Sequence, residues 1–140
     1  MELNHHMHII IYSSTKDDHF EKIQKEVVGN LSSGISVQYL NSCKELSLSL
    51  TDSVMGSTIF LIFLHDLAEL SKISKLKKRL NDFKSTILIL PDTDLMTLRA
   101  GLQLYPRYVT CAKEDYKDVS IVINNMISNY HHTATFSKSL

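Results

Sequence analysis

His65 and Asp66 form a pair of side chains that can do chemistry, and they stand directly after an unbroken apolar run over residues 59–64. A run this short, rich in Ile and Phe, is typical of a strand buried on both faces of a parallel sheet. In open α/β sheets, ligands and reacting groups gather just beyond the carboxyl ends of such strands. The chemistry of this chain therefore depends on what stands at His65, at Asp66 and at the ends of the neighbouring strands.

Each residue of the pair has two interpretations. Asp66 could accept a phosphoryl group, but Asp66 and Glu69 also have the spacing of a capping box at the start of a helix. We favour the cap. His65 could accept phosphate or bind a metal, but a lone histidine at a strand end is more often a hydrogen-bonded structural residue. We expect that structural role here.

Carboxylates also follow the first and fourth predicted strands, as Asp17, Asp18, Asp92 and Asp94. Together with Asp66 they could ring the carboxyl edge of a sheet and hold a cation. Each also fits a helix N-cap, where a carboxylate accepts backbone N–H bonds near the positive end of the helix dipole. We favour caps, with Asp18 and Glu21 as the capping box of the first helix.

Cysteine and histidine patterns do not predict a metal or redox site. Cys43 and Cys111 are too few for a disulfide framework or a zinc site, so a reducing cytoplasm is the expected location. Cys111 beside Lys113 could be a reactive thiolate, but a small apolar filler is the simpler interpretation. Most of the other histidines cluster near the chain ends, where no helix fixes their spacing. These are His5, His6, His8, His131 and His132.

The overall composition excludes some classes of function. Fifteen basic residues balance fifteen acidic ones, so bulk charge predicts neither a nucleic-acid nor a membrane partner. The lysine-rich stretch over residues 72–79 is expected to be a solvated helix face, because no reading element accompanies it. No apolar run is long enough to span a membrane, and the start of the chain lacks the basic region and cleavage site of a secretory signal.

Hydrophobic patterning predicts five strands that alternate with five helices. The predicted strands cover residues 9–12, 35–39, 59–64, 86–90 and 108–111. The predicted helices cover residues 18–31, 43–54, 67–80, 95–102 and 119–130. Alternation of this kind implies a parallel sheet with helices on both of its faces.

The strand patterns also predict the order of the strands in the sheet. The second strand alternates apolar and polar residues, as expected at an edge, whereas the first, third and fourth are continuously apolar. This favours the order 2-1-3-4-5 of the flavodoxin-like, doubly wound α/β class, with three layers, α/β/α. We expect a flexible leader over residues 1–7, one domain over 8–130, and a tail or the start of a linker over 131–140.

The order and lengths of these elements resemble the receiver domain of two-component response regulators, over about residues 8–130. The most specific stretches are residues 70–91, LSKISKLKKRLNDFKSTILILP, and residues 94–126, DLMTLRAGLQLYPRYVTCAKEDYKDVSIVINNM. They are similar to the third helix and fourth strand of that family, and to its fourth helix, fifth strand and fifth helix. Tyr108 matches the aromatic residue that family members turn between two orientations on activation.

The resemblance implies a phosphorylation site whose residues this chain has replaced. Receivers hold Mg²⁺ with an acidic pair after the first strand, and an Asp that ends their third strand accepts phosphate from a histidine kinase. A hydroxyl residue ends their fourth strand and a lysine their fifth. The matching positions here are Ser13, Ser14, His65 or the next residue Asp66, Pro91 and Cys111. Mg²⁺ and a phosphoryl group would lack their charge partners, so the chain is interpreted as a degenerate receiver, or pseudo-receiver.

We therefore expect a receiver-like signalling domain of a two-component, phosphorelay-type system that is not phosphorylated, is not an enzyme and acts by protein-protein contact. In the family, the surface around the fourth helix, fifth strand and fifth helix carries dimer and partner contacts. Here that surface mixes Arg and Tyr, which are enriched at interface hot spots. Its residues are Arg99, Gln103, Tyr105, Arg107 and Tyr108. The expected partner is a protein or a second copy, not nucleic acid or a membrane; the alternative is an ordinary wet surface.

Two other functions stay open. A phosphorylatable receiver could use Asp66 in a shifted register, with Mg²⁺ bound near it; otherwise no cofactor is expected. A flavodoxin-like domain could instead bind a small ligand at the point where the strand order reverses. The hydroxyls and amides of Ser13, Ser14 and Thr15 would then cradle a phosphate.

Overall fold

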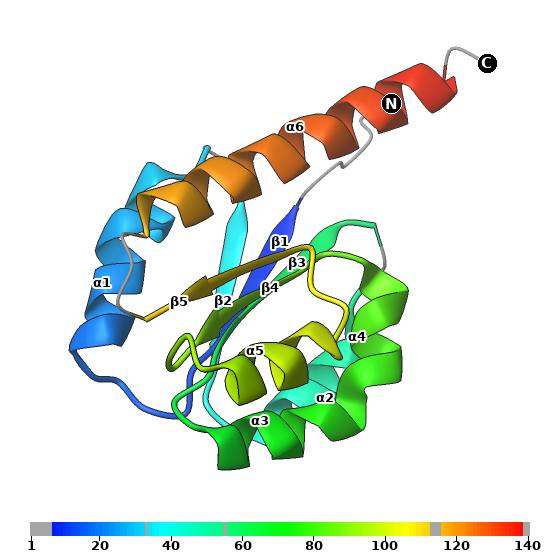
Figure 1. The fold of residues 1–140 in the computed structure, drawn as a ribbon. Helices are drawn as coiled ribbons and strands as arrows, with labels where there is room; N and C mark the ends of the chain where they lie inside the picture. The colour runs from blue at the N-terminus through cyan, green and yellow to red at the C-terminus, as the bar shows by residue number, and fades with distance from the viewer. Residues whose placement is uncertain (1–6, 33, 55, 113–115, 139–140) are drawn as a thin grey trace.

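The computed structural model of this protein describes residues 7–32, 34–54, 56–112 and 116–138. Five parallel strands form one sheet in the order β2-β1-β3-β4-β5. Helices α1 and α6 cover one face of this sheet, and α2 to α5 cover the other (Figure 1). The predicted doubly wound, three-layer α/β/α fold and its strand order are therefore confirmed. The predicted leader lies almost entirely outside the described residues.

The strands occur where the apolar runs predicted them. Their bounds are β1 (His8–Tyr12), β2 (Ser36–Leu40), β3 (Thr58–Phe63), β4 (Thr86–Leu90) and β5 (Tyr108–Cys111). Every residue of β3 and β4 is buried, whereas β2 is partly exposed along most of its length. The register pairs Tyr12 with Ile62 and Phe63 with Ile89, so the loops after β1, β3 and β4 meet at one edge of the sheet.

The helices agree with the predicted segments in place but differ in extent: the helix predicted over 18–31 ends at Glu26 and is followed by a 3-10 turn, and the helix predicted over 43–54 ends at Asp52. Their bounds are α1 (Asp18–Glu26), η1 (Val28–Asn30), α2 (Cys43–Asp52), α3 (Leu67–Ile73), η2 (Ser74–Leu76), α4 (Lys77–Phe83), α5 (Leu95–Leu102) and α6 (Lys117–Lys138). The segment predicted as one helix over 67–80 is interrupted by the 3-10 turn η2. Helix α6 continues past residue 130 into the predicted tail, because neither Pro nor Gly stands there to end it, and it extends beyond the sheet (Figure 1).

The sheet divides the hydrophobic core in two, as the alternation of side chains along a strand requires. Ile9, Ile11 and Leu61 face α1 and α6, where they pack with residues such as Ile23 and Ile123. Their neighbours along the strands face α2 to α5, where Phe60 meets the ring of Phe83 edge-on at 4.9 Å between centroids. Within the described residues, no helix is long and apolar enough to cross a membrane.

Candidate functional site

The loops after β1 and β3 bring part of the predicted site together. Ser14, His65 and Asp66 line one hollow of about 420 Å³, beside the start of α2 and the outer side of α3. Ser13 is buried directly behind it, at 2% exposure. The other two positions lie elsewhere: Pro91 follows β4, and Cys111 lines a separate hollow of about 320 Å³.

His65 is held by hydrogen bonds to the loop that follows β1. Its Nε2 lies 3.0 Å from the Thr15 hydroxyl and 3.3 Å from the Ser13 hydroxyl. Its Nδ1 lies 3.8 Å from a carboxylate oxygen of Asp17, and its ring packs against Phe63 at 4.6 Å between centroids. His65 is hydrogen-bonded, as expected of a residue with a structural role, although the sequence did not indicate that Thr15 and Asp17 are its neighbours.

Asp66 is the N-cap of α3, as the capping-box spacing predicted. Its Oδ1 accepts a hydrogen bond from the backbone N–H of Glu69 at 2.8 Å. Glu69 in turn accepts bonds on both of its carboxylate oxygens, from the backbone N–H of His65 at 2.8 Å and from the Tyr12 hydroxyl at 3.1 Å. Both carboxylates therefore accept hydrogen bonds from neighbouring groups, and both also line the hollow.

The Tyr12 hydroxyl stays protonated at neutral pH and so remains a hydrogen-bond donor to Glu69. Burial, followed by the adjacent Glu69 carboxylate and the hydrogen bond to it, raises the pKa of the Tyr12 phenol well above its usual value of 10.0. The phenol therefore keeps its proton and donates a hydrogen bond to Glu69. This contact joins the end of β1 to α3 across the floor of the hollow.

The other carboxylates at this edge only partly match the expected caps. The cap of α1 is Asp17 and not Asp18, because Asp17 has the extended backbone that lets its Oδ1 reach the N–H of Phe20 at 3.1 Å. Asp94 occupies the N-cap position of α5, but its side chain makes no capping bond. Asp92 instead accepts from the Asp94 N–H at 3.0 Å. Among the described residues, no group of three or more potential ligands could hold a metal ion.

Cys111 ends β5 outside any disulfide and is buried at 5% exposure, as a small apolar filler would be. Lys113, which could have activated it, lies outside the described residues. The hollow that Cys111 lines also contains Asp92, Leu98 and Tyr108. This hollow lies beside the predicted contact surface, and it is separate from the hollow at His65.

Helix α5 turns its leucines away from the core. An apolar stripe on a surface helix normally faces the core, yet Leu95, Met96 and Leu102 are 61%, 71% and 52% exposed. The buried side of α5 consists of Thr97 and Gly101. A Cβ at Gly101 would lie only 3.0 Å from Leu90 Cδ2, so the helix lies against β4 through small residues.

The outward side of α5 therefore forms an exposed patch, which we call the α5 apolar face: Leu95, Met96, Leu98, Leu102 and Tyr105. Of the predicted contact residues, Arg99, Gln103 and Arg107 are exposed on the same segment, and Tyr108 is half-buried beside Leu98. Arg99 and Arg107 are the only charged residues between Leu95 and Ala112. The predicted contact residues thus lie on and around the α5 apolar face, but its leucines were not among them, although Gly101 and Thr97 on the opposite side of the helix could have indicated them.

Comparison with known proteins identifies the fold. No family model matches the sequence, and no curated protein matches it. The solved signal receiver domain of an HD domain-containing protein from Pseudomonas fluorescens matches with a TM-score of 0.67 at 9% identity, over 91% of this chain and 98% of that one. This chain has the receiver fold. A pilus assembly-related protein from Burkholderia pseudomallei also matches, with a TM-score of 0.64 at 14% identity, over 91% of this chain and 94% of that one.

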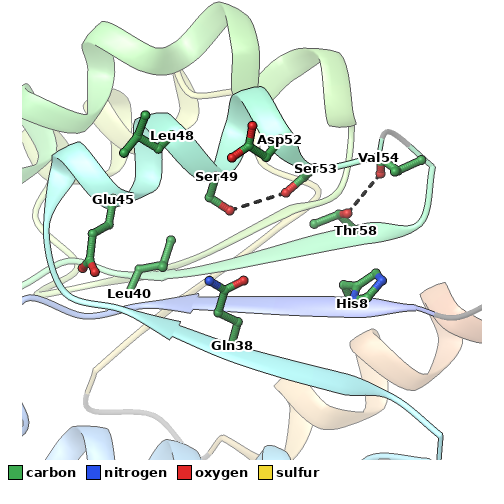
Figure 2. Close-up of a pocket in the computed structure, with 10 residues that line it drawn as sticks. All are labelled: His8, Gln38, Leu40, Glu45, Leu48, Ser49, Asp52, Ser53, Val54 and Thr58. Carbon is green, nitrogen blue, oxygen red and sulfur yellow. Dashed lines mark hydrogen bonds between the residues drawn. The ribbon is translucent and has the colours of Figure 1, made fainter.

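The receiver-like domain has a further hollow away from both groups of site residues. It measures about 430 Å³ and lies between α2 and strands β1 and β2, from His8 at the start of β1 to Leu40 at the end of β2 (Figure 2). His8 and Gln38 point into it from the strands (Figure 2). Ser49 of α2 and Ser53, which follows α2, line its other side, and their hydroxyl oxygens lie 3.4 Å apart. This hollow runs along the length of the strands beneath α2, whereas ligands of doubly wound folds bind beyond the carboxyl ends of the strands.

Proposed function

We propose that this receiver-like domain signals by protein-protein contact in a two-component type of system, without being switched by phosphate and without being an enzyme. The observation that carries the proposal is the α5 apolar face. Contiguous exposed apolar residues that are rimmed by polar ones mark interaction sites on protein surfaces. Leu95, Met96 and Leu102 have no part in the core, so their exposure is explained if a partner covers them.

The residues at the phosphorylation positions support the second half of the proposal. Ser13 and Ser14 replace the acidic pair, and hydroxyls bind Mg²⁺ far more weakly than carboxylates. One carboxylate oxygen of Asp66 caps α3, and His65 is bonded to the loop after β1. Cys111 is buried where receivers have a cationic lysine. A phosphoryl group placed here would lack the charges that stabilise it.

The chemistry of the contact surface limits the kind of partner. Its charges are two arginines, Arg99 and Arg107, amid exposed leucines and tyrosine. That composition suits a protein surface with apolar anchors and a few carboxylates, or a second copy of this chain, and it is too weakly charged for nucleic acid. Cys43 and Cys111 form no disulfide, which suits a reducing compartment such as the cytoplasm.

Site-specific crosslinking tests the contact. A photoreactive p-benzoylphenylalanine is placed at Met96, on the α5 apolar face, and in a second protein at Ile121, which is 57% exposed on α6. In cells that make the chain, we expect an adduct of defined mass from Met96 and none of the same mass from Ile121. Equal adducts from both positions, or none from Met96, would contradict the proposal.

A matched substitution separates contact from folding. Leu102→Gln should reduce the Met96 adduct by more than about fivefold, as loss of an interface anchor does. The free energy of unfolding should change by less than about 1 kcal/mol, because Leu102 is 52% exposed. An unchanged adduct would show that Leu102 is not part of the contact.

Titration with beryllofluoride and Mg²⁺, followed by NMR of the backbone amides, tests the absence of phosphorylation. We expect no shifts at His65, Asp66 or Asp92 at millimolar Mg²⁺. Shifts centred on these residues would favour a phosphorylatable receiver that uses Asp66.

A small-ligand domain is the second candidate, favoured by one observation. The hollow of about 420 Å³ lies at the carboxyl ends of β1 and β3, where the strand order reverses. Native mass spectrometry of the purified protein decides this point: a stoichiometric adduct of small mass would support the ligand function, and a bare chain mass would contradict it.

A further inference from the structure

We propose that strand β2 pairs with β2 of a second copy of this chain, so that two sheets join into one continuous sheet. β2 lies at one edge of the sheet and, among the described residues, pairs only with β1. An edge strand presents a row of unpaired N–H and C=O groups that can bond to another strand. This inference goes beyond the proposed function and does not depend on it, because it uses no residue of the α5 apolar face.

The outer edge of β2 presents the backbone groups of Val37 and Tyr39. The N–H of Ser36 donates to the carbonyl oxygen of Met7 at 3.1 Å, on the side of β1. Backbone groups of successive residues in a strand point to opposite sides, so Gln38 also faces β1, and Val37 and Tyr39 face outwards. Within the part of the chain that the structure describes, no strand pairs with these outward groups.

β2 lacks the features that usually protect an edge strand, which are charged side chains, proline and bulges. No Asp, Glu, Lys, Arg, His or Pro stands between Glu26 and Lys44, and the register of β2 with β1 is unbroken. The other edge strand, β5, stands in the sequence between Arg107 and the charged run over residues 113–115. A joined sheet would therefore end in a protected β5 at each side, and pairing would stop at two copies.

A two-fold axis through Gln38 matches the outward groups of two copies. In an antiparallel pair, Val37 then lies opposite Tyr39 of the second copy, and each outward N–H meets a carbonyl oxygen. An aromatic residue opposite a β-branched one is a favourable cross-strand pair. Gln38 lies opposite Gln38 of the second copy in a non-hydrogen-bonded pair, where side chains approach most closely and two amides can bond to each other.

The side chains on both faces of this edge are uncharged groups that a second copy would cover. Tyr39 is 38% exposed, and its ring meets that of Phe20 on α1 edge-on at 5.4 Å between centroids. On the opposite face, Gln38 lines the hollow beneath α2 together with Leu48, which is 57% exposed (Figure 2). An identical neutral edge fits this surface better than a charged segment does, because a charge placed there would lose water without gaining a partner.

The oligomeric state of the intact chain tests the contact. Sedimentation equilibrium is measured at chain concentrations up to about 1 mM, because so short a pair of strands makes a small interface and a weak dimer. We expect a reversible dimer with twice the chain mass of 16.0 kDa. A chain that stays monomeric over this range would overturn the proposal and leave the edge to an extended segment of another protein.

Substitutions at Gln38 test the two-fold arrangement, because this residue lies opposite itself. Gln38→Lys and Gln38→Glu each place like charges side by side, so each should raise the dissociation constant of the dimer at least about tenfold. An equimolar mixture of the two variants should restore the dimer, since Lys then faces Glu. Asn125→Lys is the matched control, because it adds a charge at an exposed position of α6, and it should leave the dimer unchanged. A dimer that survives both Gln38 variants, or a mixture that stays monomeric, would overturn the proposal.

Hydrogen exchange of the backbone amides in the wild-type protein locates the contact without any substitution. The N–H groups of Val37 and Tyr39 should exchange at least about tenfold more slowly where the dimer forms than in dilute solution. The N–H of Gln38 faces β1 in both states and serves as the internal control. A dimer that is lost in Leu102→Gln, with unchanged exchange at Val37 and Tyr39, would place the contact on α5 and overturn the proposal.

Discussion

At the scale of single residues, Asp66 shows how a carboxylate positions the start of a helix. It stands two residues after the buried Leu64, and it is one of the two residues, with His65, that match the phosphoacceptor position of receivers. Its Oδ1 is bonded to the Glu69 N–H at 2.8 Å, so its position is set by the first turn of α3. The same geometry predicts how substitutions should behave.

Asp66→Ala should lower the free energy of unfolding by about 1 kcal/mol, because the first turn of α3 loses its capping acceptor. Asp66→Asn should lower the free energy of unfolding by only a few tenths of a kcal/mol, since the amide oxygen can accept the same hydrogen bond. Urea denaturation of the three proteins measures both values. Equal losses for the two variants would mean that the charge of Asp66, and not its capping oxygen, is what the structure uses.

At the scale of elements, α6 is positioned by an amide as well as by its apolar side. Asn124 Oδ1 accepts from the backbone N–H and hydroxyl of Ser32, at 3.2 and 3.1 Å, and its Nδ2 donates to the carbonyl oxygen of Asn30 at 3.0 Å. These bonds join α6 to the segment between η1 and β2. They determine which way the helix is rotated over the sheet.

Asn124→Ala should lower the free energy of unfolding by about 1–2 kcal/mol, because it leaves backbone groups of Asn30 and Ser32 without these partners. Asn125→Ala is the matched control, since Asn125 is the next residue on the same helix and is exposed. It should change stability by less than about 0.5 kcal/mol. Thermal or urea unfolding of the pair is the measurement, and similar losses in both would indicate a general effect on helix propensity.

Helix α5 illustrates the opposite case, in which packing leaves the apolar side of an element exposed. Gly101 and Thr97 let α5 approach β4 closely, and the leucines are left on the outside. A helix attached in this way contributes little of its apolar area to the core. Its apolar side is available for contact, which is why the proposed function is assigned to this element.

At the scale of the whole molecule, the two core clusters contain tyrosines whose ionisation opposes folding. Tyr116 is fully buried and donates its hydroxyl to the carbonyl oxygen of Ala112 at 3.2 Å. Burial is the main reason that the pKa of Tyr116 is raised from 10.0 to about 12, with smaller contributions from Cys111, Asp17 and Glu26. Tyr12 is shifted in the same direction.

Stability should therefore fall as the pH rises above about 10, because the unfolded chain then loses phenolic protons that the folded protein retains. Each of the two tyrosines should remove about 1 kcal/mol from the free energy of unfolding by pH 11. Tyr116→Phe should abolish about half of this pH dependence, while Tyr105→Phe, at a 58% exposed position, should leave it unchanged. Urea unfolding between pH 7 and pH 11 measures how the free energy of unfolding depends on pH. A value that stays constant over this range in the wild-type protein would contradict the prediction.

The sequence by itself determined the elements and their order in the sheet. Continuous apolar runs in β3 and β4 require burial on both faces, and the alternation in β2 requires an edge. It also determined the Asp66 cap, because that contact joins residues three apart on one turn of helix. Such features depend on neighbours along the chain, so a periodic pattern or a short spacing is sufficient to predict them.

Only the tertiary structure decided what surrounds His65 and which way α5 faces. The partners of His65 lie about fifty residues away in the chain, and the parallel register of β1 and β3 brings them together. Leu95 and Leu102 have helical spacing in either orientation of α5, and the closeness of Gly101 to Leu90 selects the outward one. Hydrophobic periodicity predicts that a helix has an apolar side, but packing against β4 decides whether that side is buried.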